Sequence, residues 1–181
     1  AFASFSLSAS SVYILNDCLD LSSDRQHPRK KNRPFASGQL SIPFGLLMAI
    51  GALSGGILLA LMLPPLFMLV LGGYLVLTTA YTFYLKQFVM VDVIALAQLY
   101  TLRIYAGGAA TGIVPSHWLL TFSLFLFLSL ALVKRYTELR LLSRSDEKEV
   151  HGRGYWVTDI EHIASIGSSS GLVAVLVLAL Y

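Results

Sequence analysis

Four oxygen-bearing side chains follow one another closely near the start of the chain, at Asn16, Asp17, Asp20 and Asp24. On a helix with 100° per residue they lie within about 100° of one another, so they share roughly one quarter of the helix surface. Three carboxylates at this spacing repel one another, and the negative end of a helix dipole adds to the repulsion. A hard cation would offset that repulsion. The spacing therefore predicts a Mg²⁺ site, since Mg²⁺ binds one or two carboxylates together with water and substrate phosphate oxygens.

A basic run follows these carboxylates directly, and its members are Arg25, Arg29, Lys30, Lys31 and Arg33. Their side chains supply hydrogen-bond donors for phosphate oxygens. A solvated helix end is the alternative interpretation of the acidic residues, and their crowding argues against it. Taken alone, the basic run is equally typical of a lipid-headgroup anchor. Together, a group of carboxylates and a basic loop indicate a site for a magnesium diphosphate.

Composition indicates the setting of this site. The chain has 181 residues, of which 56% are hydrophobic and only 13% are charged, about half of the roughly 25% that is typical of soluble domains. A stretch of 52 residues, from Pro34 to Leu85, contains no Asp, Glu, Lys or Arg. An uncharged stretch of this length indicates an integral membrane protein. We therefore expect an all-α, polytopic transmembrane bundle that forms one domain over residues 1–181.

Helical segments account for nearly the whole chain, and polar or Pro/Gly-rich turns separate them. The expected helices cover residues 1–24, 42–63, 66–85, 92–112, 118–133 and 158–181. The last of them has a capping box at its start, with Thr158 as N-cap and Glu161 three residues later. Because apolar sequence is present at both ends, we expect the chain to be part of a longer membrane protein.

The distribution of Lys and Arg predicts the orientation of the chain. Twelve of the thirteen lie in three segments, residues 25–33, Lys86 and residues 134–153, which alternating spans place at one membrane face. By the positive-inside rule this is the cytoplasmic face of the plasma membrane. The net charge of +3 then reflects loop bias and not nucleic-acid binding.

Several residues outside the first motif have two interpretations. Tyr81 and Lys86 are either interfacial anchors or contacts to a diphosphate. Arg103 lies roughly 16 Å along the helix axis from Asp92, at a depth where a charge normally faces a wet cavity or a buried partner.

Lys134, Arg135 and Glu138 are either a second substrate-facing cluster or a local ion pair between Lys134 and Glu138. The four His residues have no spacing that is typical of a zinc site.

The motifs resemble those of the UbiA superfamily of intramembrane prenyltransferases, most closely the decaprenyl-phosphate phosphoribosyltransferase-like branch. The resemblance rests on Asn16-Asp17-x-x-Asp20-x-x-x-Asp24, Lys31-Asn32-Arg33-Pro34, Tyr81-x-x-x-x-Lys86, Asp92, Leu102-Arg103 with Gly107-Gly108, and Lys134-Arg135-Tyr136-x-Glu138. In addition, Gly152-Arg153-Gly154-Tyr155 is similar to relatives in which a haloacid-dehalogenase-like domain precedes the membrane part.

The resemblance implies a nine-helix bundle around a cavity open to lipid, of which this chain would hold about six helices. It implies Mg²⁺ bound by Asn16, Asp20 and Asp24, with Asp20, Asp24, Arg33 and Lys86 as catalytic residues. Substrate would be bound by Asp17, Lys31, Tyr81, Arg103, Lys134, Arg135 and Glu138.

The implied reaction is transfer of a polyprenyl group from an isoprenyl diphosphate to an acceptor. In the phosphoribosyl branch a polyprenyl phosphate is the acceptor and phosphoribosyl diphosphate is the donor. Most family members have a second D-x-x-x-D motif, whereas this chain has Lys134-Arg135-Tyr136-Thr137-Glu138 in that region. A membrane transporter or scaffold with a cation site but no chemistry is the alternative of another class.

Overall fold

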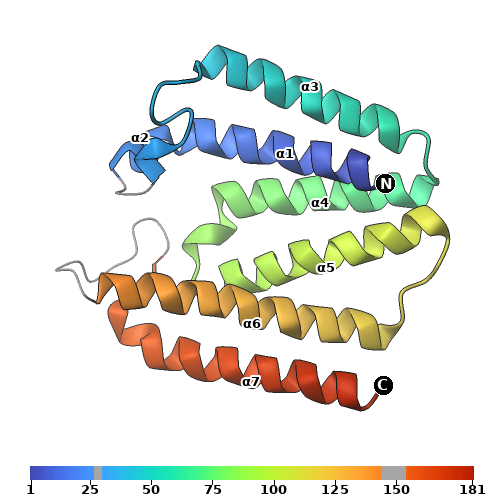
Figure 1. Ribbon diagram of the computed structural model, residues 1–181. Helices are drawn as coiled ribbons and strands as arrows, with labels where there is room; N and C mark the ends of the chain where they lie inside the picture. The colour runs from blue at the N-terminus through green and yellow to red at the C-terminus, as the bar shows by residue number, and fades with distance from the viewer. Residues whose placement is uncertain (27–29, 144–153) are drawn as a thin grey trace. The chain divides into compact units, whose positions relative to one another are not determined.

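The computed structural model describes residues 1–26, 30–143 and 154–181, and these residues are predominantly helical (Figure 1). The helices are α1 (Phe2–Leu19), α2 (Leu21–Gln26), η1 (Lys30–Asn32), α3 (Ile42–Ala60), α4 (Pro65–Phe83), η2 (Leu85–Gln87), α5 (Val91–Thr111), α6 (His117–Leu142), η3 (Val157–Asp159) and α7 (Ile160–Ala179). Four segments are long and apolar enough to cross a membrane: α3, α4, α6 and residues 157–179. The prediction of a helical membrane bundle is confirmed.

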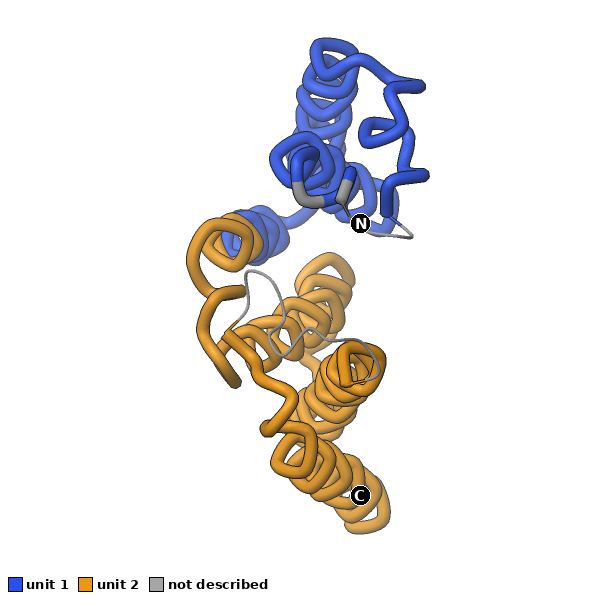
Figure 2. Tube along the Cα trace, turned by 90° about the vertical axis from the view of Figure 1, so that its left-hand side faces the viewer, with its two compact units in different colours: residues 1–75 blue, residues 76–181 orange. Residues whose placement is uncertain are grey.

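The chain divides into two compact units, residues 1–75 and residues 76–181 (Figure 2). The boundary falls inside α4, so the first part of this helix belongs to unit 1 and its last turns belong to unit 2. The carboxylates and basic residues near the start of the chain lie in unit 1. The later candidate residues, from Tyr81 onward, lie in unit 2.

In unit 1, small residues allow α1 and α3 to pack closely (Figure 1). The Ser4 hydroxyl donates a 2.7 Å hydrogen bond to the carbonyl oxygen of Gly56. A Cβ atom at Gly56 would lie 2.9 Å from the carbonyl oxygen of Ser4 and closer still to the Ser8 hydroxyl. Close approach of small residues is a common way for membrane helices to associate, because apolar side chains gain little by leaving lipid.

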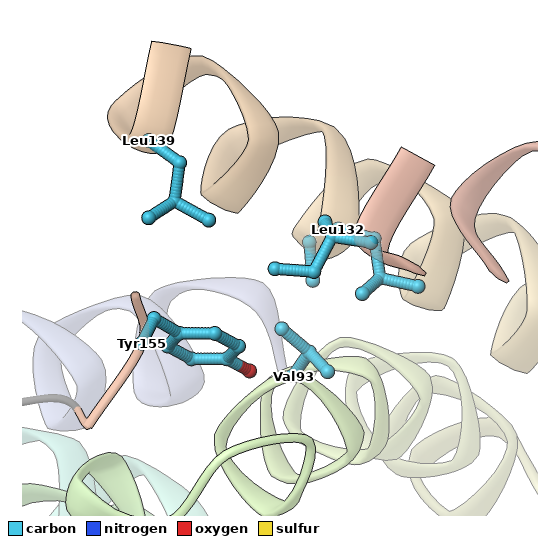
Figure 3. Close-up of a cluster of buried hydrophobic side chains, with 6 residues drawn as sticks. Val93, Leu132, Leu139 and Tyr155 are labelled. Atoms are coloured by element: carbon cyan, nitrogen blue, oxygen red, sulfur yellow. The ribbon is translucent and has the colours of Figure 1, made fainter. Parts of the chain in front are cut away.

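In unit 2, α6 packs against both α5 and α7. The core between them contains Val93 of α5, Leu132 and Leu139 of α6, and Tyr155 from the segment before η3 (Figure 3). A hydrogen bond of 2.8 Å from the Ser129 hydroxyl to the Gly167 carbonyl oxygen links α6 to α7.

Two predicted helix ends were wrong. The first helix ends at Leu19, and the chain turns at Asp20 (φ −85°, ψ 11°) before α2 begins. The short polar side chains of this region compete with the helix for backbone hydrogen bonds, which weakens a continuous helix. At the other extreme, α6 continues to Leu142 instead of ending near Val133. It does so because Arg135 and Leu139 are buried inside unit 2, so the helix still has a packed face beyond its apolar part.

The predicted capping box at Thr158 and Glu161 was also wrong. The structure forms the cap two residues earlier, where the backbone N–H of Trp156 donates a 2.9 Å hydrogen bond to the Asp159 carboxylate. A short 3₁₀ turn therefore precedes α7, and the Asp159 side chain satisfies a backbone donor that the helix leaves unpaired.

Replacing Gly56 with Ala is expected to lower the free energy of unfolding of the full-length protein by roughly 1–3 kcal/mol. The added methyl group meets backbone and forces α1 away from α3. Gly51→Ala on the same helix is the matched control, because a Cβ atom there meets nothing within 4 Å. Thermal unfolding in detergent micelles measures both changes. Equal stability of the two variants would contradict this packing.

Candidate functional site

In unit 1, one guanidinium joins two of the predicted site carboxylates. Nη1 of Arg33 donates hydrogen bonds of 2.8 Å to Asp17 Oδ1 and 2.9 Å to Asp24 Oδ2. The ammonium group of Lys30 lies 3.8 Å from Asp24 Oδ1. We call these four residues the Arg33 cluster. It brings Asp17 and Asp24 to the same guanidinium, although the helix is interrupted between them.

The loop after α2 returns Arg33 to the carboxylates through a few local contacts. Lys30–Asn32 forms a single 3₁₀ turn, in which the Arg33 N–H bonds to the Lys30 carbonyl at 2.9 Å. Two residues later the buried Phe35 ring fills the space beside Gly45 of α3. Nε of Arg25 donates a 3.2 Å hydrogen bond to the Ala36 carbonyl oxygen. The anchored segment 35–36 thus fixes where Arg33 leaves the backbone.

The carboxylates of the first motif interact with one another electrostatically. Asp17 lies in the last turn of α1, outside the four apolar spans. Its pKa is raised, first by burial, against the opposing effect of Arg33, and further by the charges of Asp24 and Asp20. Three negative groups therefore lie near one another at this end of unit 1, as the sequence predicts, and Arg33 compensates only part of their charge.

The oxygen donors of this cluster suit Mg²⁺ held jointly with a phosphate ligand. Among residues 1–26, 30–143 and 154–181, no three acidic, His or Cys side chains converge closely enough to form a metal cage by themselves. Mg²⁺ does not require such a cage, because it retains several waters and binds through one or two carboxylates and substrate phosphates. Arg33 and Lys30 add the positive charge that a diphosphate would require.

The remaining residues of the first motif and basic run differ in their surroundings. Asn16 and Asp20 are partly buried, and the Asp20 N–H bonds to the Asn16 carbonyl oxygen at 2.9 Å. Lys31 is exposed. Arg29 lies outside the described residues. The structure thus brings Asp17, Asp24 and Arg33 into direct contact, while the ligand roles expected of Asn16 and Asp20 stay predictions.

Unit 2 contains a second charged cluster, in which Asp92, Arg135 and Tyr155 are buried and Glu138 is partly exposed. Nε of Arg135 donates a 2.7 Å hydrogen bond to Asp92 Oδ2, and its Nη1 donates to Glu138. The Tyr155 hydroxyl donates to Asp92 Oδ1 and accepts a 2.9 Å hydrogen bond from the Met90 N–H. We call Asp92, Arg135, Glu138 and Tyr155 the buried polar cluster. Burial, followed by the hydrogen bond to Asp92, raises the pKa of Tyr155 well above its ordinary value.

This cluster corrects one sequence-based expectation and adds a residue. The partner of Glu138 is Arg135, three residues before it, and not Lys134, which is exposed. Tyr155 was not among the predicted site residues. In the sequence it was noted only as the last residue of Gly152-Arg153-Gly154-Tyr155. The structure shows that the neighbouring Gly154 has a φ of +63°, which marks a sharp turn.

Three other predicted residues lie in unit 2. Tyr81 lies beside the buried polar cluster, where its hydroxyl interacts with the Arg135 side chain. Lys86 lies in η2, between α4 and α5. Arg103 is exposed in unit 2, and its guanidinium carbon lies 4.9 Å from the centre of the Tyr100 ring. Its predicted place in a cavity stays a prediction.

Comparisons with known proteins relate most of the chain to one family. The model of the UbiA prenyltransferase family matches residues 1–151. The chain is 39% identical to the protein y4nM of Sinorhizobium fredii, over 99% of this chain and 36% of that protein. It is 36% identical to the nodulation protein NoeC of Azorhizobium caulinodans, over 100% of this chain and 59% of that protein.

A further relative is the decaprenyl-phosphate phosphoribosyltransferase of Mycobacterium tuberculosis, which is 39% identical over 80% of this chain and 48% of that protein. The chain thus spans between about one third and three fifths of the length of these relatives.

Arg33→Gln is expected to lower the free energy of unfolding of the full-length protein by roughly 1–2 kcal/mol in the absence of substrate. The substitution leaves the buried Asp24 carboxylate without its strongest donor. Lys31→Gln removes the same charge from an exposed side chain and is the matched control. Chemical unfolding at neutral pH compares the two. An equal loss in both would show that Arg33 contributes only net charge.

Proposed function

Because the chain belongs to the UbiA prenyltransferase family, we propose that it forms the donor-binding part of a membrane-embedded, Mg²⁺-dependent transferase that acts on a diphosphate substrate. The observation that supports this most strongly is the Arg33 cluster, in which two carboxylates and two cations meet at a helix end. Such a mixture suits a ligand that itself combines a divalent metal with a polyanion.

In this proposal Asn16, Asp20 and Asp24 hold Mg²⁺, and Asp17 supports them. When bound, Mg²⁺ neutralises charge that develops on the leaving diphosphate. Mg²⁺ would offset the negative charge of the carboxylates. The N–H groups of Arg33 that now bond to Asp17 and Asp24 would then be free to bond to diphosphate oxygens. Lys86 supplies a second cationic contact, and Lys31 and Lys134 add positive charge for an anionic substrate pair.

The donor we favour is phosphoribosyl diphosphate, and the acceptor is a polyprenyl phosphate. The support is the identity to relatives named decaprenyl-phosphate phosphoribosyltransferase. An oxygen of the ionised acceptor phosphate forms a bond to C1 of the ribose, while the bond from C1 to the diphosphate oxygen breaks. The products are a polyprenyl phosphoryl-phosphoribose and diphosphate, and no proton need be transferred. The apolar surroundings accept the polyprenyl chain and exclude the water that would otherwise capture C1.

A second candidate reaction is transfer of a prenyl group from its diphosphate to another acceptor. The name of the family favours it. The same carboxylates and cations would serve, because diphosphate is the leaving group in both reactions. The absence of a D-x-x-x-D motif near residue 134 favours the first candidate, since Lys134 suits a more anionic substrate pair.

We further propose that the reacting groups lie at the cytoplasmic face of the plasma membrane. Four helices are long and apolar enough to span a bilayer. Twelve of the thirteen Lys and Arg residues lie in residues 25–33, at Lys86 and in residues 134–153, whereas the intervening turns at residues 63–65 and 112–117 contain none. The positive-inside rule places the charged segments in the cytoplasm. Phosphoribosyl diphosphate, a charged metabolite, would reach the site from that side.

The full-length protein in lipid bilayers with Mg²⁺ is expected to transfer label from phosphoribosyl diphosphate to a polyprenyl phosphate. Thin-layer separation of the lipid products measures the transfer. Labelled prenyl diphosphates with candidate acceptors are offered in parallel. Product only in that parallel assay would establish the second candidate, and no turnover of either donor would favour a transporter or scaffold.

Asp20→Ala is expected to lower Mg²⁺-dependent kcat/KM by about 100-fold or more, because the metal loses a carboxylate ligand. Glu161→Ala, which removes an exposed carboxylate at the start of α7, is the matched control and should retain activity. Initial rates across a Mg²⁺ titration compare the two variants. Normal turnover of Asp20→Ala would show that the metal assignment is wrong.

A further inference from the structure

Lys86 lies in a short connection whose backbone is under strain. The connection runs from the end of α4 at Phe83 through η2 to the start of α5 at Val91. Its last residue, Met90, has φ of +66°, a left-handed conformation that is costly for a residue with a side chain. Such a conformation persists only where the surroundings fix it.

Tyr155 supplies one of the contacts that fix this connection. Its hydroxyl oxygen accepts a 2.9 Å hydrogen bond from the strained Met90 N–H, although the two residues are 65 positions apart. The preceding Gly154 packs on the same connection: a Cβ atom there would lie 3.1 Å from the Gln87 carbonyl oxygen and 3.6 Å from Val89. The segment before η3 therefore rests on the connection at both its middle and its end.

The hydroxyl of Tyr155 is itself held by the first turn of α5. It donates to Asp92 Oδ1, while Arg135 donates to Asp92 Oδ2 at 2.7 Å, so both carboxylate oxygens have a partner. Tyr155, Asp92 and Arg135 are each 0% exposed. Figure 3 shows the Tyr155 ring beside Val93 and below Leu132 and Leu139. In such a dry environment each hydrogen bond that is formed is strong and a donor without a partner is costly. Nη2 of Arg135 is a buried donor without a hydrogen-bond partner among the described residues.

The other end of the connection meets the same guanidinium. The Tyr81 hydroxyl, in the last turns of α4, interacts with Arg135. Contacts from one buried cluster therefore reach Tyr81 before Lys86 and Met90 after it. A segment held at both ends, with its middle against Gly154, has little freedom to move the Lys86 side chain.

The charge of the cluster argues against a phosphate subsite. Arg135 contacts two carboxylates, those of Asp92 and Glu138, so these three side chains have a net charge of about −1 when ionised. An added phosphate would meet repulsion that the single guanidinium does not offset. Arg135 and Glu138 therefore suit a supporting role, whereas the exposed Lys134 suits contact with an anionic substrate.

We propose that Asp92, Arg135 and Tyr155 are positioning residues, which fix the Lys86 connection through Tyr81, Met90 and Gly154 so that Lys86 meets the donor diphosphate. The proposal rests on the proposed function only for the role of Lys86. The fixing of the connection is independent of any substrate. Misplacement of a charged group by about 1 Å is enough to cost roughly 100-fold in rate.

A spin label tests the fixing without any activity. The label is attached to the cysteine of a Gln87→Cys variant of the full-length protein, and Gln87 is exposed. The same protein has the substitution Cys18→Ser, which removes the one cysteine among residues 1–181. Tyr155→Phe is expected to increase label mobility in the electron paramagnetic resonance spectrum. Gly154→Ala, which adds a Cβ atom against Gln87 at a strained φ, should do the same without altering the polar network. Tyr105→Phe is the control.

Unchanged spectra in both Tyr155→Phe and Gly154→Ala would overturn the proposal, whatever the enzyme assays show. Increased mobility in both, with no change in Tyr105→Phe, would support it even if the donor proved to be different from the one proposed. The result for the label therefore separates failure of this inference from failure of the proposed function.

Kinetics then test the link to Lys86. Tyr155→Phe is expected to lower kcat/KM for the diphosphate donor about 10- to 100-fold, mainly through KM if Lys86 binds substrate and transition state alike. In a Lys86→Ala background the same substitution should have little further effect, because the group that it positions is gone. A purely structural role of Tyr155 predicts equal losses in both backgrounds, and that outcome would overturn the link.

Discussion

A guanidinium shared between two carboxylates organises the polar residues of each unit. In unit 1, Arg33 joins Asp17 and Asp24, and in unit 2, Arg135 joins Asp92 and Glu138. The two differ in exposure: the Arg33 side chain is 41% exposed, whereas that of Arg135 is 0% exposed. A pair with one exposed partner is open to displacement by a ligand, while a fully buried pair is costly to break. The exposure of Arg33 therefore supports the proposal that the first cluster binds the ligand and that the second has a supporting role.

This difference gives the two clusters complementary roles in the proposed reaction. The Arg33 cluster holds opposite charges together, and each sign has a counterpart in a magnesium diphosphate. In the buried polar cluster both carboxylate oxygens of Asp92 bond to other side chains of the protein. The hydrogen bond from the Met90 N–H to Tyr155 also links the start of α5 to the segment before η3. Apolar helices on either side keep water from the second cluster, which strengthens its hydrogen bonds.

Helical periodicity was enough to predict what is local in sequence. It placed Asp17 and Asp24 on one face, and hydropathy located α3, α4 and α5 to within a few residues. The return of Arg33 depends on a 3₁₀ turn and on Phe35, which no periodicity describes. The pairing of Asp92 with Arg135 spans 43 positions. Nearby Glu138 offered Arg135 a local partner, so the sequence alone did not require a distant one. The Mg²⁺ ligands stay predictions, because their geometry depends on a bound substrate.

Reciprocal binding of Mg²⁺ and diphosphate tests the central claim most directly. Calorimetry on the full-length protein in lipid nanodiscs would give the affinity for each ligand with and without the other. The account predicts that each ligand increases the affinity for the other by the same factor, because the Arg33 cluster is completed only by both. Tight Mg²⁺ binding without diphosphate, unchanged when diphosphate is added, would contradict it.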